Sequence, residues 1–279
     1  MRKYQIVNKI CLLIIIQLLP FQSFSQYFDF PTILLDSANI IVSYKLDWKQ
    51  DTNDLNRIRH EKMTLLIGKE VSLFMSYNFY QLRLIGRKAE KEGRLDDFLN
   101  SEEITNLRTR FSYSIYKNYP KGKITYTDKV LPAFLKYEEN FDLFKWQLSD
   151  QVDTINGYFA HCAYTDYGGR RWVAWYAPDI PLSDGPYKFR GLPGLILMLY
   201  DDQKHYTFTF DEIVRPKEVI ALEYLDIDWV KTKRIEFLKA ESNFKNDIIS
   251  RAKETGADNV SQRLAAQNLS RRNNPIELK

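Results

Sequence analysis

Strict alternation of apolar and polar residues is the feature of this chain that most limits its fold. In residues 39–48, apolar side chains occupy every second position: Ile40, Val42, Tyr44, Leu46 and Trp48. Residues 206–211 repeat the pattern with aromatic side chains. Alternation gives a strand one buried and one solvent-exposed face, as is usual in antiparallel sheets. The sequence therefore predicts a mainly β fold.

Turn-forming residues separate several predicted strands. Gly68 and Lys69 join strands at 63–67 and 71–75, and Tyr167-Gly168-Gly169 joins strands at 157–165 and 170–176. The polar residues 201–204 join strands at 195–200 and 206–211. Such short polar or glycine-rich connections are typical of β-hairpins. Further short strands are predicted at 122–127, 133–138 and 144–148.

Two segments have the composition of helices. Residues 76–94 mix apolar and charged side chains without alternation, and residues 228–254 have apolar residues at helical spacing, with Gly256 to end the helix. We predict an α+β, mainly β protein: a curved antiparallel sheet or open half-barrel with one mid-chain helix and a long C-terminal helix. Residues 26–256 form one β-rich domain, and residues 257–279 are an exposed or loosely docked tail.

The first 25 residues are typical of a secretory signal peptide. A basic start (Arg2, Lys3, Lys9) precedes an apolar run at 10–19 and a small-residue cleavage site ending at Ser25. The run is too short to span a membrane, so the processed chain is predicted to be periplasmic or secreted and not membrane-spanning. Without these basic residues the formal charge falls from +4 to +1, which gives no electrostatic basis for nucleic-acid binding.

Metal binding has little support in the sequence. The weak candidate ligands are His161, Cys162 and His205. His161 and Cys162 are adjacent in a predicted strand, so their side chains point to opposite faces. No histidine or cysteine pair has the spacing of a metal site. We expect Cys162 to be a buried apolar side chain, and we expect no cofactor.

The hexapeptide at residues 191–196 carries a family resemblance. It reads Gly191, Leu192, Pro193, Gly194, Leu195 and Ile196, and upstream of it stand, in order, Cys162, the Gly169–Trp172 turn, Trp175-Tyr176, Ile180-Pro181 and Gly185-Pro186. The chain resembles the GLPGLI family of secreted Bacteroidetes proteins, more weakly at Val42–Tyr44, around Gly68 and at 274–277. The resemblance implies a β-rich periplasmic or secreted protein without an established biochemical activity.

The same resemblance implies possible relatives and partners. Family members look similar to the bowl-shaped β domain that precedes the catalytic part of some bacterial peptide-N-glycanases. They are also associated with outer-membrane β-barrel transporters, including TonB-dependent ones. The resemblance therefore implies an accessory or binding role.

The hexapeptide itself has a structural interpretation. Pro193 favours the first corner of a type II turn, and Gly194 accepts the positive φ of the second corner. The apolar run from Leu195 is then a strand buried on both faces. This motif is predicted to support folding and packing, without chemistry of its own.

Ligand contacts are predicted just upstream. The loop at 177–190 contains polar and aromatic residues stiffened by three prolines, and such loops on a β scaffold commonly bind ligands. Trp172 and Trp175 alternate to opposite faces of their strand, so at least one belongs to the core. The candidate binding residues are Arg170, Arg171, Trp172, Trp175, Tyr187, Lys188 and Arg190.

Three functions remain open. The leading hypothesis is a non-enzymatic accessory or binding protein whose concave face accepts a peptide, an apolar ligand or part of an outer-membrane barrel. An alternative is a periplasmic hydrolase of glycan or peptide with Asp179 or Asp184 as acid or base, although the chain has no recognised catalytic motif. A second alternative is a copper or zinc carrier. A filled concave face would favour a scaffold, and an open one a binding site.

Overall fold

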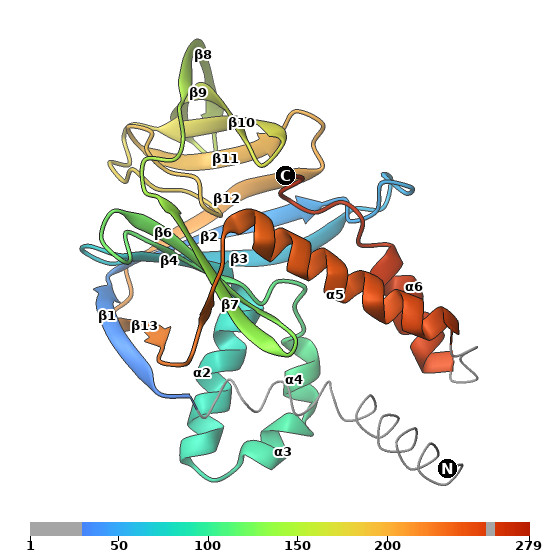
Figure 1. The fold of residues 1–279 in the computed structure, drawn as a ribbon. Helices are drawn as coiled ribbons and strands as arrows, with labels where there is room; N and C mark the ends of the chain where they lie inside the picture. Colours follow the sequence, from blue (N-terminus) through green and yellow to red (C-terminus); the bar gives the residue numbers. More distant parts are fainter. Residues whose placement is uncertain (1–29, 255–259) are drawn as a thin grey trace, which may run out of the picture.

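A computed structural model describes residues 30–254 and 260–279 (Figure 1). The predicted signal peptide lies outside the described residues. Among the helices of the described ranges, none is long and apolar enough to cross a membrane.

One twelve-stranded sheet dominates the described part of the chain, in the order β14-β7-β6-β5-β4-β3-β2-β12-β11-β10-β9-β8. Neighbouring strands are antiparallel except β14 and β7, which are parallel. The sheet stays open and bends (Figure 1), which confirms the predicted mainly β, curved architecture. Its strands are β2 (Ile40–Trp48), β3 (Arg59–Ile67), β4 (Ser72–Ser76), β5 (Ser114–Lys117), β6 (Lys123–Val130), β7 (Ala133–Asn140), β8 (Gln147–Ile155), β9 (Tyr158–Tyr167), β10 (Arg170–Ala177), β11 (Leu195–Asp201), β12 (Tyr206–Val214) and β14 (Val230–Lys231).

The outer face of β3, β4 and β5 carries a separate hydrophobic core. It packs against the helices α2 (Tyr77–Lys91), α3 (Leu95–Leu99) and α4 (Glu102–Asn106) and a small sheet of β1 (Thr32–Ala38) and β13 (Ile220–Leu225). Helix α2 confirms the mid-chain helix, and the Ser76 hydroxyl caps it by accepting from Phe79 N at 3.3 Å. These elements cover the face of the sheet opposite to the site described below (Figure 1).

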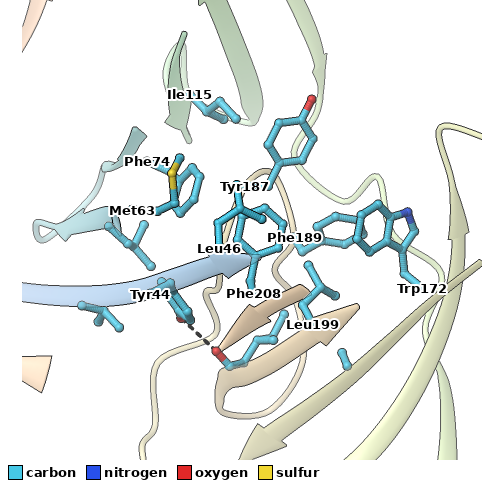
Figure 2. Packing of buried hydrophobic residues seen from close by; sticks show 14 of the residues in the cluster. Tyr44, Leu46, Met63, Phe74, Ile115, Trp172, Tyr187, Phe189, Leu199 and Phe208 are labelled. Atoms are coloured by element: carbon cyan, nitrogen blue, oxygen red, sulfur yellow. Dashed lines mark hydrogen bonds between the residues drawn. The ribbon is translucent and has the colours of Figure 1, made fainter. Parts of the chain in front are cut away.

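The inner face, on the other side of the same strands, is filled. Residues 178–194, between β10 and β11, turn Tyr187 and Phe189 into a core that includes Leu46, Phe208 and Trp172 (Figure 2). The Tyr44 hydroxyl donates to the carbonyl of Ile196 at 2.8 Å (Figure 2). An open concave face therefore does not exist along this part of the sheet.

The hexapeptide closes the filling segment. Leu192, Leu195 and Ile196 are buried, and Leu195 N and Ile196 N donate to backbone carbonyls of the same segment at 3.0 Å each. The predicted type II turn is wrong: Gly194 has φ +150° and donates to Leu192 O at 2.9 Å across a single residue. A Cβ at Gly194 would overlap the Ala177 carbonyl, so close backbone approach is what requires glycine there.

The C-terminal region differs from the predicted helix and tail. Helix α5 is Arg234–Glu254, and α6 (Val260–Ser270) follows it. Helix α5 begins later than residue 228 because Trp229 packs edge-on against Phe134 and residues 230–231 pair with β7. The loosely docked tail is wrong for its last residues: the chain returns to the sheet (Figure 1), and Asn274 and Glu277 are buried.

Candidate functional site

The predicted acid and base residues occupy different environments. Asp184 is buried, and its carboxylate accepts from Lys117 Nζ at 2.5 Å, Ser72 Oγ at 2.5 Å and its neighbour Gly185 N at 2.8 Å. Asp179 is solvent-exposed. Burial lowers the pKa of Lys117, although the Asp184 carboxylate opposes this shift. Asp184 therefore anchors residues 178–194 to β4 and β5. Asp179 and Asp184 do not form a catalytic pair.

Lys188 lies at the centre of a buried polar cluster. Its ammonium donates to Glu139 Oε2 and Glu277 Oε1, both at 2.6 Å, and to the hydroxyls of Tyr137 and Tyr167 at 2.7 and 2.6 Å. The side chain is fully buried. Four tyrosine rings surround the ammonium with centroid distances of 4.6–5.4 Å, those of Tyr126, Tyr137, Tyr167 and Tyr187. Every proton of the ammonium therefore has an acceptor within the protein.

Glu277 links this cluster to the C-terminal segment. Its carboxylate accepts from Tyr187 Oη at 2.5 Å and forms an ion pair with Arg234 of α5. Burial alone would raise its pKa, but Lys188 and Arg234 hold the pKa of Glu277 below its ordinary value. We call Lys188, Glu139, Glu277 and Arg234, together with the tyrosines above, the lysine cluster.

Arg170 fixes the same segment from the other side. Its guanidinium donates to Asp201 Oδ2 at 2.9 Å, to Asn274 Oδ1 at 2.6 Å and to the carbonyls of Pro275 and Ile276 at 2.7 and 3.0 Å. The side chains of Arg170 and Asp201 are almost completely buried. These contacts explain why residues 274–277 are docked: their backbone and side-chain acceptors satisfy a buried guanidinium.

The remaining predicted binding residues divide between core and surface. Trp172 is fully buried and its indole donates to Tyr167 O at 3.0 Å. Trp175 is half-buried, Arg171 is exposed beside the ring of Tyr164, and Arg190 is half-buried on the ring of Phe141. The structure therefore places most of the predicted group in packing roles and does not bring it together into one open site.

The candidate metal ligands lie apart. His161 stacks on Tyr176 with ring centroids 5.8 Å apart, and Cys162 is fully buried. His205 Nδ1 lies 3.3 Å from Arg170 Nη1, and its pKa is lowered by burial and by the positive charges of Arg170 and Lys49. Within the described ranges, no group of three or more His, Cys, Asp or Glu residues is placed to hold a metal ion.

A pocket of about 170 Å³ remains between the inner face of the sheet, helix α5 and the C-terminal segment. It is lined by strands β2, β6, β7 and β12, by the stretch before β5, by α5 and by the chain after α6. It could not be predicted from the sequence, because its walls come from eight separate segments, Tyr187 of residues 178–194 included. Its lining residues are Trp48, Gln50, Arg110, Phe111, Tyr113, Tyr126, Asp128, Tyr137, Tyr187, Tyr206, Phe237, Leu238, Glu241, Arg272, Asn274, Pro275, Ile276 and Glu277.

Aromatic rings form the walls of this pocket. Tyr126 and Tyr137 stack with centroids 5.0 Å apart, and Phe237 of α5 lies 5.2 Å from each of them. Trp48 and Phe111 pack edge-on at 5.0 Å. Such walls offer apolar area and electron-rich ring faces to a bound group.

Asp128 is a partly buried carboxyl group in the wall of the pocket. Its Oδ1 accepts from Ser112 Oγ and Lys129 N, both at 2.7 Å, and its Oδ2 has no hydrogen-bond partner among the described residues. Burial raises its pKa to about 7, with help from the nearby negative charge of Glu241. A sequence signal for Asp128 exists: it follows Ile124 and Tyr126 on the apolar face of an alternating strand.

Two arginines also line the pocket. Arg110 is exposed and Arg272 is half-buried, and both line the cavity. Burial lowers the pKa of Arg272 to about 10, with contributions from the positive charges of Arg110 and Arg59. The pocket is therefore lined by charges of both signs, the carboxyl groups of Asp128, Glu241 and Glu277 and the guanidinium groups of Arg110 and Arg272.

Residues 167–198 match a Bacteroidetes-associated family described as a protein of unknown function (Porph_ging). Of the residues that line the pocket, only Tyr187 lies in that stretch. No curated protein matches the chain.

Two solved structures of PNGF-II, in space groups P21 and C2, are similar to this chain. Their TM-scores are 0.49 and 0.46, and in both cases the identity is 10% over 76% of this chain and 34% of the other. The chain thus spans about a third of the length of those proteins. The match at residues 167–198 relates that stretch, with its hexapeptide, to a family of unknown function, and membership of the GLPGLI family stays a prediction.

Proposed function

We propose that this protein is a binding protein that takes a small cationic group, with its amino nitrogen next to Asp128, into the pocket under α5. One observation carries the proposal: a carboxyl group with an unpaired oxygen faces a cavity walled by aromatic rings. A concave, mainly apolar pocket with a few converging polar groups and a perturbed pKa is the usual form of a ligand site.

The size of the pocket restricts the ligand. A cavity of about 150 Å³ accommodates benzene, so 170 Å³ fits one ring or a short alkyl chain with a terminal amine. Such a group could be a whole small molecule or one side chain of a peptide. The tyrosine faces and the carboxyl group together recognise an ammonium group through cation–π contact and ion pairing.

Binding of an ammonium group is coupled to proton release. Near pH 7 the carboxyl group of Asp128 is about half protonated, and an ammonium group beside it would favour the ionised form. We therefore expect affinity for an amine to rise as the pH increases from 6 to 8. The proton released on binding is measurable by calorimetry in buffers of different ionisation enthalpy.

The test is a titration of the full-length chain with benzylamine, with benzyl alcohol as the matched neutral ligand. Benzylamine should bind at least tenfold more tightly than benzyl alcohol, and Asp128→Asn should remove that preference. Asp179→Asn, which changes an exposed carboxylate, should leave it unchanged. Equal binding of both ligands, or an unchanged preference in Asp128→Asn, would rule the proposal out.

A hydrolase, the alternative function, would use a different pair of carboxyl groups from Asp179 and Asp184. Asp128, protonated near neutral pH, and Glu241 share the pocket, and one protonated and one ionised carboxyl group are what acid–base hydrolysis needs. Glycan or peptide cleavage that disappears in both Asp128→Asn and Glu241→Gln would favour this function over binding. A periplasmic or secreted location and an outer-membrane transporter as partner remain proposals from the sequence.

A further inference from the structure

Three arginines from distant parts of the chain meet beside the pocket. Arg59 begins β3 and pairs across the sheet with Trp48, which lines the cavity. Arg110 precedes β5, and Arg272 follows α6; both line the cavity as well. The backbone of Arg110 is held over β3 because Arg110 N donates to Glu61 Oε2 at 3.2 Å.

The position of Arg272 is fixed by the C-terminal segment. Lys245 Nζ of α5 donates to Arg272 O at 2.7 Å, and the amide side chain of Asn273 donates to Asp51 Oδ1 at 2.8 Å. The next residue, Asn274, donates from its side chain to Lys49 O at 2.7 Å. The chain is therefore anchored at Arg272 and at the two residues that follow it, and Arg272 lines the cavity.

None of these guanidinium groups forms a salt bridge with a described residue, although the charge of Arg110 acts on the nearby carboxylate of Glu61. Within residues 30–254 and 260–279, none of the three forms an ion pair or a side-chain hydrogen bond, and Nε of Arg59 is buried with no partner. The nearby carboxylate of Glu61 is occupied by Thr109 Oγ1 and Arg110 N. Each guanidinium therefore keeps donors free, and burial, together with the positive charges of Arg110 and Arg59, lowers the pKa of Arg272.

Charges of the same sign cost free energy when they are partly buried without an opposite charge. Folded proteins usually pair such charges with a group of opposite charge. Arg170 is an example of a fully paired guanidinium group in this protein, since Asp201 and three acceptors of the C-terminal segment surround it. Guanidinium groups are planar multi-donor groups suited to carboxylate and phosphate. Among the residues whose side chains the structure describes, Arg59, Arg110 and Arg272 have no salt-bridge partner, so each can still accept an anion.

We propose that Arg59, Arg110 and Arg272 form a binding site for a carboxylate or phosphate group at the edge of the pocket. Combined with the proposed function, on which this extension rests, the site defines the ligand as a zwitterion. Its amino group lies beside Asp128 and its anionic group beside the arginines, as in an amino acid or an aminoalkyl phosphate.

The test uses the full-length chain and single anions as probes. Inorganic phosphate and acetate are titrated separately, which also distinguishes the two anion classes. Arg110→Gln and Arg272→Gln should each weaken binding of the preferred anion about tenfold, because each removes one charge-assisted contact. Arg108→Gln is the matched control, since it removes an exposed guanidinium two residues from Arg110. Near-UV circular dichroism checks that each variant is folded.

The outcomes separate this site from the amine site. Anion binding that is lost in Arg110→Gln and kept in Arg108→Gln supports the site even if benzylamine does not bind at all. Absence of anion binding, or equal weakening by all three substitutions, overturns it, whatever benzylamine does. If both sites exist, 4-(aminomethyl)benzoate should bind at least tenfold more tightly than benzylamine, and Arg272→Gln should abolish that gain.

Discussion

The lysine cluster and the pocket lie on the same inner face of the sheet and share several tyrosines. They differ in whether their charged groups are paired with partners inside the protein. In the lysine cluster the ammonium of Lys188 has two carboxylates and two hydroxyls within 2.7 Å. At the pocket, one oxygen of Asp128 has no hydrogen-bond partner and the arginines form no salt bridge among the described residues. Complete pairing indicates a structural role, whereas charges left unpaired beside a cavity indicate a ligand.

The two regions also respond to pH in opposite directions. Glu277 has a lowered pKa in the folded state, so it stabilises the fold above its ordinary pKa of 4.5 and loses that contribution as the pH falls. Asp128 has a pKa raised from 3.8 to about 7, so stability falls as the pH rises between these values. Substitutions in each region therefore test the comparison directly.

The largest effect is expected from Lys188→Met. This substitution leaves the carboxylates of Glu139 and Glu277 buried with only Arg234 as a cation, and breaking a buried ion pair costs about 3–5 kcal/mol. Urea unfolding measures the loss. Lys239→Met on the exposed face of α5 is the control and should change the free energy of unfolding by less than about 0.5 kcal/mol. A Lys188→Met variant as stable as the parent would contradict a structural role for the cluster.

A slightly smaller loss is expected from Asp184→Asn. It removes the counter-charge of buried Lys117, which keeps the carbonyls of Gly185 and Phe189 as acceptors, so we expect a loss of about 3 kcal/mol. Asp179→Asn should have almost no effect on stability, because that side chain is exposed. Equal, small changes in both variants would mean that Asp184 is not part of the core.

The sequence predicted the strands that alternate, and the reason is local. Strands such as β2 have one buried face, and the hairpin at Gly168 and Gly169 is determined by adjacent residues. Strand β5 was missed because all four of its residues are buried, so no alternation exists to read. The expectation of an accessible loop failed because Lys188 and Asp184 look like surface residues until distant partners are known.

The pocket was beyond sequence reasoning for the same reason. The residues next to Asp128 in the sequence give no sign of a cavity. Arg59, Arg110 and Arg272 are separated from one another in the sequence by more than one element of structure. Only the assembled sheet, α5 and the C-terminal segment bring Asp128, Arg110 and Arg272 to one cavity. Local pattern thus determined the elements, whereas long-range contacts determined which charges are paired.

The smallest effect on stability is expected from Asp128→Asn, and its sign separates the two regions. Asparagine keeps the Oδ1 acceptor for Ser112 Oγ and Lys129 N and never ionises. The parent should lose stability from pH 4 to pH 7 as it comes to hold a partly buried negative charge, and the variant should not. At pH 8 we expect the variant to be more stable by about 1–2 kcal/mol, less than the full shift because the carboxyl group faces the cavity.

Urea unfolding at pH 5 and pH 8 measures this difference. A structural carboxylate such as Glu277 would give the reverse result, with the amide variant less stable at pH 8. Saturating amine should restore the advantage of the parent, because only the ionised carboxylate pairs with an ammonium group and a ligand that binds the folded state stabilises it. Asp128 would then be a charge that destabilises the empty protein and is compensated by its ligand, the opposite of Lys188.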